Sequence, residues 1–424
     1  MKKKVLITGG SGLLAVNWAL SIRDEYEVTL LLHQRKIYLK GVKTDIANIS
    51  SLDECKAVLD RHKPDVVIHT AGLTSVEKCE ENPNLAQEVN VDLAKNIAIA
   101  CDKQNVKLVH ISTDHLFSGE GSFVTEESNA TPINNYAKTK LEGERQVQKN
   151  CKDALIIRTN FFCWGTKYRQ SFSDFIISKL RNNESIDLFS DVFFTTILAE
   201  ELAQKVHQLI DAKASGVFNV VGSECMSKYE FGVKLANCFG LDANLINEIS
   251  INDKPNLVKR PKDMSLSNKK ICKTLNCKMP SIDEQLQTLK QQESDSGINH
   301  IRTDIIPYGR HYIDEDDIRS VVDVLRNGML TQGPKIAEFE NRIADYVGAK
   351  YAVAVANGTA ALHLSCMALE LGEGDKVITS PNTFVATSNS VLYVGAKPVF
   401  VDIDKRTLNI DIDQIEQAIL DSNN

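Results

Sequence analysis

The chain has 424 residues, of which 43% are hydrophobic and 25% are charged, and its formal net charge is -7. This balance is typical of a globular protein and excludes a disordered or fibrous chain, and the length allows two or three domains. The acidic charge, with Lys and Arg scattered, argues against a nucleic acid partner. No apolar run approaches the ~20 residues of a membrane span, and the cysteines lack metal-ligand spacing, so we expect a cytoplasmic protein with no membrane partner and no metal.

Short apolar runs alternate with amphipathic stretches from the start of the chain. The runs predict strands over residues 5–8, 28–32, 66–69, 108–112 and 155–158. The amphipathic stretches predict helices over residues 13–23, 52–61, 85–103 and 135–149. This order predicts an α/β fold of the Rossmann type, a doubly wound parallel sheet with helices on both faces.

Four regions follow from this pattern. We expect residues 1–170 to form a dinucleotide-binding Rossmann domain and residues 171–290 to form a smaller substrate-binding lobe interleaved with it. The lobe includes predicted helices at 172–182, 199–212 and 228–239 and a strand at 216–221. The polar stretch 291–305 predicts a linker. Residues 306–424 resume the α/β pattern, with predicted helices at 314–326 and 336–346 and strands at 352–356, 377–380 and 398–401.

A glycine-rich turn follows the first predicted strand. Gly9 permits a tight turn, Gly12 lets the backbone approach a pyrophosphate, and the helix that begins at Leu13 and Leu14 presents its first amides to the phosphates. The position of the turn at the first strand-to-helix junction predicts that Gly9, Ser11, Gly12, Leu13 and Leu14 bind a dinucleotide, NADP or NAD.

The choice between the two cofactors depends on the end of the second predicted strand. The acid that would hold the ribose hydroxyls is missing, and Arg35 and Lys36 stand near its place. A guanidinium can pair with a 2′-phosphate, which favours NADPH. Alternatively, Arg35 and Lys36 form an ordinary solvated loop. Asp45 and Ile46 are expected beside the adenine.

A phenol and an ammonium lie four residues apart in the predicted helix 135–149. Tyr136 and Lys140 therefore share one helical face, although such a pair also arises by chance. A positive charge on Lys140 would favour the phenolate of Tyr136, making it a proton donor or acceptor near neutral pH. Ser112, Thr113 and Asp114 stand at the carboxyl end of the fourth strand, where active-site hydroxyls are expected.

Together these motifs resemble the extended short-chain dehydrogenase/reductase superfamily. Over residues 1–290 the resemblance is to its dTDP-4-dehydrorhamnose reductase type. The matching stretches are His69-Thr70-Ala71-Gly72, Val76-Glu77-Lys78-Cys79-Glu80, Asn90-Val91, Ser112-Thr113-Asp114-His115-Leu116-Phe117, Arg158-Thr159 and Arg260-Pro261-Lys262-Asp263.

The resemblance implies that a nicotinamide cofactor reduces the C4 ketone of a nucleotide-linked deoxysugar while Tyr136 gives the proton. Thr113, or as a second choice Ser112, would hydrogen-bond the ketone oxygen. Asn90 would position the active-site helix or a water. Lys140 would also bind the nicotinamide ribose, and the backbone at Ala71 and Gly72 would lie against the cofactor.

Substrate contacts are implied for Asp114, His115, Arg158 and Arg260. The two arginines would clamp a diphosphate, or they would be ordinary salt-bridge residues, and His115 is either a substrate contact or structural. The chain departs from the family where Phe193, Phe194 and Thr195 replace a segment that usually contains Gly and Pro. This departure leaves the identity of the sugar open.

Residues 306–424 resemble the beginning of the DegT-type, pyridoxal phosphate (PLP)-dependent sugar aminotransferases, of fold type I. Gly358, Thr359 and Ala360 would cradle the cofactor phosphate and Phe384 would stack on its ring, unless they are only a turn and a core aromatic. In that family the Schiff-base lysine comes later than the last residue here. We therefore expect an incomplete domain without aminotransferase activity by itself, which binds PLP only if completed.

Both halves point to nucleotide-sugar chemistry for deoxysugar or surface polysaccharide synthesis. A reductase is the leading hypothesis. An epimerase or dehydratase, a part of a 4-amino-sugar nucleotide transaminase, and a non-catalytic dinucleotide-binding subunit are the alternatives. The expected ligand is a nucleotide sugar, and a homo-oligomer remains open.

Overall fold

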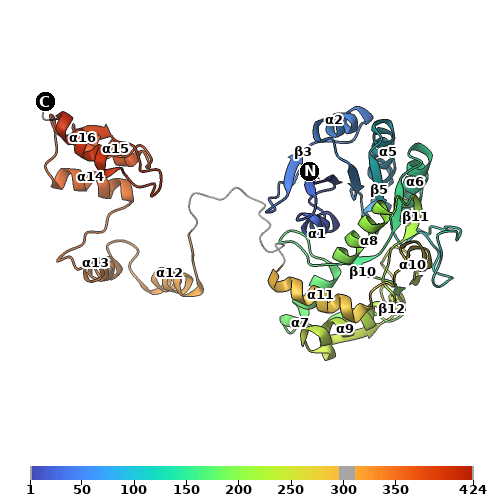
Figure 1. The fold of residues 1–424 in the computed structure, drawn as a ribbon. Helices are drawn as coiled ribbons and strands as arrows, with labels where there is room; N and C mark the ends of the chain where they lie inside the picture. Colours follow the sequence, from blue (N-terminus) through green and yellow to red (C-terminus); the bar gives the residue numbers. More distant parts are fainter. Residues whose placement is uncertain (1, 296–310, 423–424) are drawn as a thin grey trace. The chain divides into compact units, whose positions relative to one another are not determined.

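The computed structural model describes residues 2–295 and 311–422. The chain divides into two compact units, Met1–Tyr308 and Gly309–Asn424. Figure 1 draws the helices and strands of both units.

The N-terminal unit is built on a seven-stranded parallel sheet with strand order β11-β6-β5-β4-β1-β2-β3. The chain starts at β1 and winds outward in both directions, which confirms the predicted doubly wound fold. The strands are β1 (Lys4–Thr8), β2 (Glu27–Leu32), β3 (Lys43–Ile46), β4 (Val66–His69), β5 (Lys107–Ile111), β6 (Leu155–Arg158) and β11 (Gly216–Asn219).

Helices cover both faces of this sheet because alternate residues of each strand point to opposite sides. Val5 and Ile7 of β1 pack in one core with Trp18, between the sheet and helices α1 (Leu13–Ile22) and α8 (Ala199–Asp211). Leu6 packs in a second core on the opposite face. That core lies under α2 (Leu52–His62), α5 (Leu93–Gln104) and α6 (Asn135–Asn150), and Figure 1 shows these helices along one side of the sheet.

The single helix predicted over residues 85–103 is wrong in its middle. The structure has α4 (Pro83–Gln87), a π-helical turn η1 (Glu88–Asp92) and then α5. The wider turn contains Asn90, whose side chain leaves the helix to bind the backbone at Leu73. Gly143 of α6 permits close approach, because a Cβ there would lie 2.4 Å from the carbonyl oxygen of Asn90. Such π-turns are frequent at functional sites.

A smaller lobe continues from the carboxyl ends of the strands. Its core is a group of phenylalanines centred on Phe231, whose ring lies 5.3 to 5.8 Å from those of Phe162, Phe172 and Phe194. Its helices are α7 (Phe172–Arg181), α9 (Lys228–Phe239) and α11 (Ile282–Asp295). Helix α3 (Val76–Glu81) packs instead against α4 and α6, and α10 (Lys269–Leu275) packs against β11 and α8. Its strand groups are β7 (Phe161–Phe162) with β10 (Ile197–Leu198), β8 (Ile186–Phe189) with β13 (Ile246–Ile249), and β9 (Phe193–Phe194) with β12 (Met226–Ser227) and β14 (Asp263–Met264).

Two segments assigned to the smaller lobe by the sequence belong to the main layers. Helix α8 packs against α1, and β11 pairs in parallel with β6 at the edge of the seven-stranded sheet. The lobe is thus interleaved with the Rossmann domain, because the chain returns to the main sheet at α8 and β11. The predicted linker 291–305 is also corrected at its start, since α11 extends to Asp295, and its remainder lies outside the described residues.

The C-terminal unit has fewer strands. It contains α12 (Glu315–Asn327), α13 (Pro334–Val347), α14 (Gly358–Ala368), α15 (Ala386–Tyr393) and α16 (Ile412–Ser422), with β15 (Lys376–Thr379) and β16 (Lys397–Phe400) paired in parallel. The strand predicted at 352–356 does not form within the described part of the chain. An isolated strand cannot satisfy its backbone groups, and β15 and β16 pair only with each other there.

Candidate active site

The glycine-rich turn lies between β1 and α1 and is closed by a neighbouring strand end. Gly9 has φ +66°, and a Cβ at this position would lie 2.8 Å from the Cα of Ala71, which follows β4. The amide of Gly12 donates to the carbonyl of Gly9 over 2.7 Å. Gly12 caps α1 without a side-chain hydrogen bond, so the first amides of the helix at Leu13 and Leu14 keep their hydrogen-bonding capacity. The backbone thus leaves room for a phosphate at Ser11 and Gly12.

Arg35 lies beside this turn. Its guanidinium carbon is 4.4 Å from the ring centroid of Tyr168, and the Tyr168 hydroxyl donates to the carbonyl of Ser11 over 3.0 Å. The exposed Arg35 is therefore held close to the glycine turn by Tyr168. Asp45, by contrast, pairs with Arg61 at 2.7 Å and His62 at 2.8 Å, while Ile46 is 46% exposed. The Asp45 carboxylate is already occupied by these partners.

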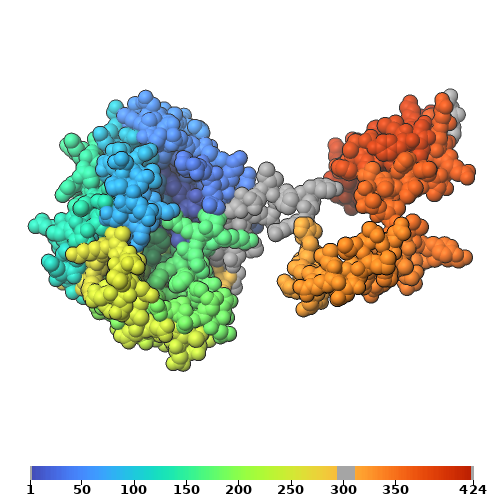
Figure 2. Space-filling model, turned by 180° about the vertical axis from the view of Figure 1, so that it is seen from behind, coloured from blue at the N-terminus to red at the C-terminus, as the bar shows by residue number. Residues whose placement is uncertain are grey.

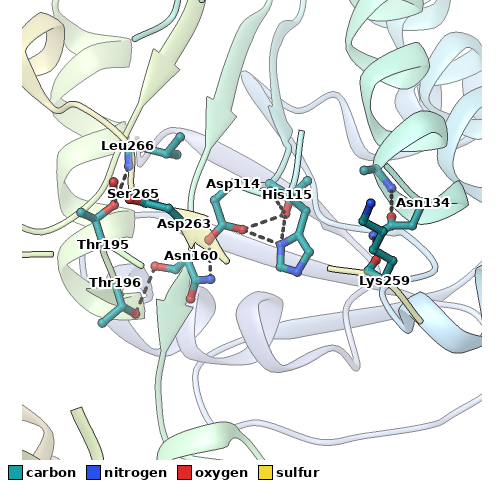
Figure 3. Close-up of polar contacts among 12 residues, drawn as sticks. Asp114, His115, Asn134, Asn160, Thr195, Thr196, Lys259, Asp263, Ser265 and Leu266 are labelled. Carbon is teal, nitrogen blue, oxygen red and sulfur yellow. Dashed lines mark hydrogen bonds and ion pairs between the residues drawn. The ribbon is translucent and has the colours of Figure 1, made fainter. Parts of the chain in front are cut away.

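The start of α6 is fixed by side chains from two other elements. Asn134 caps the helix by accepting from the amide of Ala137 over 2.8 Å, and its own amide donates to the carbonyl of Lys259 (Figure 3). Glu80 of α3 accepts from the backbone and side chain of Asn135 at 2.6 and 2.7 Å. Tyr136, the next residue, is thereby held in a defined position.

Tyr136 and Lys140 both point toward the end of β5. Lys140 Nζ donates to the carbonyl of Ile111 over 2.7 Å. Thr113 lies near enough to the Tyr136 hydroxyl for a hydrogen bond that lowers the pKa of the phenol. Burial raises the pKa of Tyr136 well above its usual value, and the bond to Thr113 lowers it only in part. Burial lowers the pKa of Lys140 to about 8. The expectation that Lys140 brings the ionisation of Tyr136 close to neutral pH is thus corrected, because burial dominates and Tyr136 stays protonated, as a proton donor requires.

Asp114 and His115, which follow β5, form a hydrogen-bonded group with Asn160 (Figure 3). The ring of His115 meets that of Tyr136 edge-on at 5.6 Å. Asp114 lies 2.8 Å from His115 Nδ1 and accepts from Asn160 over 2.6 Å. Burial opposes the ionised form of Asp114, yet His115 and Asn160 hold its pKa below the ordinary value. The hydroxyl of Ser112 is buried and lacks a partner among the described residues.

Asn90 connects the cofactor loop to the helix of Tyr136. Its side chain accepts from the amide of Leu73 over 2.8 Å and donates to the hydroxyl of Thr139 on α6 over 3.1 Å. A Cβ on Gly72 would lie 3.2 Å from the Asn90 oxygen. Ala71 and Gly72 thus pass between the glycine turn and α6.

Arg158 does not face the site as the resemblance implies. Its guanidinium is buried and donates to Glu144 over 3.0, 3.2 and 2.8 Å. The Nε and Nη2 atoms are thus taken by Glu144, and Nη1 donates to the carbonyl of Glu126 over 3.4 Å, so these contacts are those of a salt-bridge residue that joins β6 to α6. Arg260 pairs with Glu77 of α3 through one terminal nitrogen, while its Nε is buried without a partner among the described residues.

Sequence reasoning missed several side chains of this site. Asn160 orients Asp114, Tyr168 holds Arg35, and Lys228 lies against Phe194. Glu80 lies in a stretch that matches the reductase family, and Phe194 lies in the segment that departs from it. The sequence therefore drew attention to both residues. Asn160, Tyr168 and Lys228 carry no local pattern, because only long-range packing brings them to the site. Figure 2 shows the N-terminal unit hollowed between its blue first residues and the green segment.

In the C-terminal unit, Gly358, Thr359 and Ala360 begin α14 as expected. Asn357 caps this helix and accepts from the amide of Ala360 over 2.9 Å, so that amide is already used. A Cβ on Gly358 would meet nothing within 4 Å, and Phe384 is 71% exposed. The described residues thus supply a turn that nothing encloses.

Comparisons with known proteins separate the same two regions. Residues 3–294 match the family model of the RmlD substrate binding domain, and residues 311–423 match that of the DegT/DnrJ/EryC1/StrS aminotransferase family. A probable low-salt glycan biosynthesis reductase of Haloferax volcanii is 29% identical over 294 residues, which are 68% of this chain and 98% of that protein. These matches confirm the family resemblances of both regions.

A solved structure agrees with the first match. The dTDP-4-dehydrorhamnose reductase of Bacillus anthracis, in complex with NADP, is 25% identical with a TM-score of 0.61, and the match covers 69% of this chain and 100% of that one. A spore coat polysaccharide biosynthesis protein of Bacillus subtilis is 48% identical over 118 residues, 28% of this chain. The chain spans only 30% of that relative's length.

No described helix combines the length and apolar character needed to cross a membrane. No group of three or more His, Cys, Asp or Glu side chains in the described ranges could hold a metal ion.

Proposed function

The chain belongs to the RmlD substrate binding domain family, and on that premise we propose that its N-terminal unit reduces the 4-keto group of a nucleotide-linked deoxysugar with NAD(P)H. The observation that carries this proposal is that Tyr136 and Lys140 are buried together beside the end of β5, where Lys140 donates to the carbonyl of Ile111 and Tyr136 lies against His115. The reaction would serve deoxysugar or surface polysaccharide synthesis.

The residues present fit a dinucleotide. Gly9 and Ala71 are packed so closely that a Cβ would close the turn, and α1 begins with amides that no side chain caps. Ser11, Gly12, Leu13 and Leu14 would hold the pyrophosphate, and Lys140 the nicotinamide ribose. Arg35 would hold a 2′-phosphate, which favours NADPH. When bound, the reduced dinucleotide supplies a hydride to the ketone carbon.

Side chains of this protein would protonate and hydrogen-bond the oxygen of that ketone. As the carbon gains a hydride, negative charge develops on the oxygen, and Tyr136 transfers its phenolic proton there, so the product is an alcohol. Ser112, whose hydroxyl lacks a partner among the described residues, would donate a hydrogen bond to the same oxygen. Thr113 would do so once its hydroxyl turns from Asp114, to which it donates over 3.2 Å. Lys140, fixed by the carbonyl of Ile111, then stabilises the phenolate that remains.

Replacing Tyr136 by Phe tests the proposal, because it removes the proton donor and little else. Oxidation of NADPH by a dTDP-linked 4-keto-6-deoxysugar, followed at 340 nm, should slow by about 10²- to 10⁴-fold. Binding of NADPH, followed by its fluorescence, should be unchanged. Tyr26→Phe is the matched control, since Tyr26 packs against His207 of α8 and not against the residues around Tyr136. Unchanged turnover in Tyr136→Phe would refute the assignment.

A further inference from the structure

Residues 164–171 form a tight hairpin between β7 and α7. Two backbone hydrogen bonds between Thr166 and Arg169, of 2.8 and 3.1 Å, close its turn. Its base is fixed, because Trp164 is buried and the Trp164 carbonyl accepts from the side chain of Asn17 on α1 over 3.1 Å. The 164–171 hairpin is therefore an ordered element, and its side chains are held in defined positions.

The hairpin contacts the loops that follow two neighbouring strands. The Tyr168 hydroxyl donates to the carbonyl of Ser11, in the glycine turn after β1, over 3.0 Å. A terminal nitrogen of Arg169 donates to the hydroxyl of Thr74, in the loop after β4, also over 3.0 Å. The order of strands reverses between β4 and β1, and a dinucleotide binds at such a point in doubly wound sheets. The hairpin thus spans the crevice in which the proposed cofactor would lie.

Arg169 brings a positive charge to this crevice. Its side chain is exposed, and no carboxylate in the described part of the chain forms an ion pair with it. An exposed guanidinium is ordinarily solvated, so the charge by itself indicates nothing. Its position does, because the neighbouring Tyr168 is bonded to Ser11, and the amides beside Ser11 are those expected to hold a pyrophosphate. The planar fork of an arginine matches the oxygens of a phosphate, and Thr74 uses only one of its five N–H groups.

We propose that the 164–171 hairpin is a strap across the dinucleotide crevice and that Arg169 binds the pyrophosphate of the cofactor together with the amides of the glycine turn. Tyr168 is a positioning residue, since its bond to Ser11 keeps the strap on that turn. This inference rests on the proposed function and adds a contact outside the motifs that carry the family resemblance. The pyrophosphate is common to NADPH and NADH, whereas Arg35 would bind the 2′-phosphate that only NADPH carries.

Cofactor binding by the full chain tests the strap without requiring turnover. Dissociation constants for NADPH and NADH are measured by cofactor fluorescence. Loss of a charged hydrogen bond in Arg169→Met should raise both constants by the same factor, about ten- to a hundredfold. Arg169→Lys should recover part of the loss, because it keeps the charge but not the fork. Arg145→Met is the matched control, since the exposed Arg145 pairs with Glu142 of its own helix.

The size of the effect on each cofactor decides the outcome. Unchanged constants in Arg169→Met, or an equal loss in Arg145→Met, would overturn the assignment. A loss confined to NADPH would also overturn it, because that result points to the 2′-phosphate. Calorimetry with two smaller probes locates the contact on the cofactor. ADP-ribose, which keeps the pyrophosphate, should lose affinity in Arg169→Met, and AMP, which lacks it, should not. An equal loss for AMP would contradict the pyrophosphate contact.

Thr74→Val separates a pyrophosphate ligand from a structural latch. This change removes the hydrogen-bond partner of Arg169 but leaves its charge in place. A ligand role predicts that Thr74→Val leaves both dissociation constants nearly unchanged. If Arg169 only ties the hairpin to the loop after β4, Thr74→Val should weaken both cofactors as much as Arg169→Met does. That result would refute the proposal.

Tyr168→Phe tests the positioning role. It removes the donor to Ser11 and keeps the ring that lies under Arg35. If Tyr168 holds Arg169 in place, Arg169→Met should cost less affinity in the Tyr168→Phe background than in the wild type, because the two residues act as one unit. A merely structural role predicts losses that add independently. Additive losses would therefore remove Tyr168 from the strap.

The strap and the reductase assignment fail in different ways. Tyr136→Phe should leave cofactor binding intact whether or not it slows turnover. Wild-type protein that binds both cofactors, with unchanged constants in Arg169→Met, would refute the strap alone. Unchanged turnover in Tyr136→Phe with a preserved Arg169 effect would refute the reductase chemistry alone. Wild-type protein that binds neither dinucleotide would end both.

Discussion

The two units of this chain share an α/β pattern but differ in what surrounds it. In the N-terminal unit, β1 is buried on both faces and seven strands form one sheet. In the C-terminal unit two strands pair, and apolar side chains such as Tyr346 at 89% and Val353 at 79% remain exposed. A parallel sheet needs cover on both faces, so the same local pattern yields a core only where enough strands assemble.

The two helix-starting turns show the same difference at the scale of a site. Gly9 lies against Ala71, and the next loop continues through Asn90 to the helix of Tyr136. Gly358 begins a capped helix of similar local form, with nothing near the position of a Cβ. A turn of suitable sequence thus becomes a binding site only when other segments close around it.

Truncating one phenylalanine in each unit should sharpen this contrast most. Phe231 is fully buried among three other phenylalanines, so Phe231→Ala should lower the free energy of unfolding by about 3–5 kcal/mol. Phe339 is 57% exposed, and Phe339→Ala should cost under about 0.5 kcal/mol. Urea unfolding followed by tryptophan fluorescence reports the N-terminal unit alone, because Trp18 and Trp164 are the two tryptophans of the chain. Circular dichroism follows the other unit. Equal losses would break the comparison.

The next largest difference in stability is expected when one ion pair is broken in each unit. Arg158→Met leaves Glu144 buried and unpaired, which should destabilise the N-terminal unit by about 3–5 kcal/mol. Arg319→Met removes an exposed pair with Asp316 and should not change unfolding measurably. The KM for the nucleotide sugar should stay unchanged in Arg158→Met. A raised KM with normal stability would restore the diphosphate role that the resemblance implies.

Buried histidines should make the N-terminal unit sensitive to acid. Burial lowers the pKa of His110 well below its ordinary 6.5. Below that pH, His110 therefore binds a proton in the unfolded chain but remains neutral in the folded chain. Stability should therefore fall below about pH 6.5, by up to about 1.4 kcal/mol per pH unit for this residue, and His69 adds to the slope down to its pKa of about 3.

His110→Leu should flatten that slope by the share of one histidine. Both ring nitrogens of His110 lack partners among the described residues, so stability at pH 7 should not fall. Urea unfolding at pH 6.5, 5.5 and 4.5 measures the slope, and exposed His311→Leu in the other unit is the control. An unchanged slope in His110→Leu would contradict the expectation.

The smallest expected effect is a change in cofactor affinity at the glycine-rich turn between β1 and α1. Arg35→Ala should raise the KM for NADPH by about tenfold and leave that for NADH nearly unchanged, because only the former has a 2′-phosphate. Steady-state rates with both cofactors check this, and Lys36→Ala at the neighbouring exposed position is the control. An equal change for both cofactors would show that Arg35 only stacks on Tyr168.

The sequence by itself determined the features that depend on neighbours along the chain. The strand at Val66–His69 and the helix beginning at Asn135 follow from apolar spacing, and the glycine turn and the shared face of Tyr136 and Lys140 follow from local geometry. Tertiary structure alone decided which distant groups meet. It placed β11 beside β6, opened a π-turn at Asn90, paired Arg158 with Glu144 and set Lys228 on Phe194. These pairings depend on how distant segments pack in the folded protein, and the spacing of residues along the chain does not predict that packing.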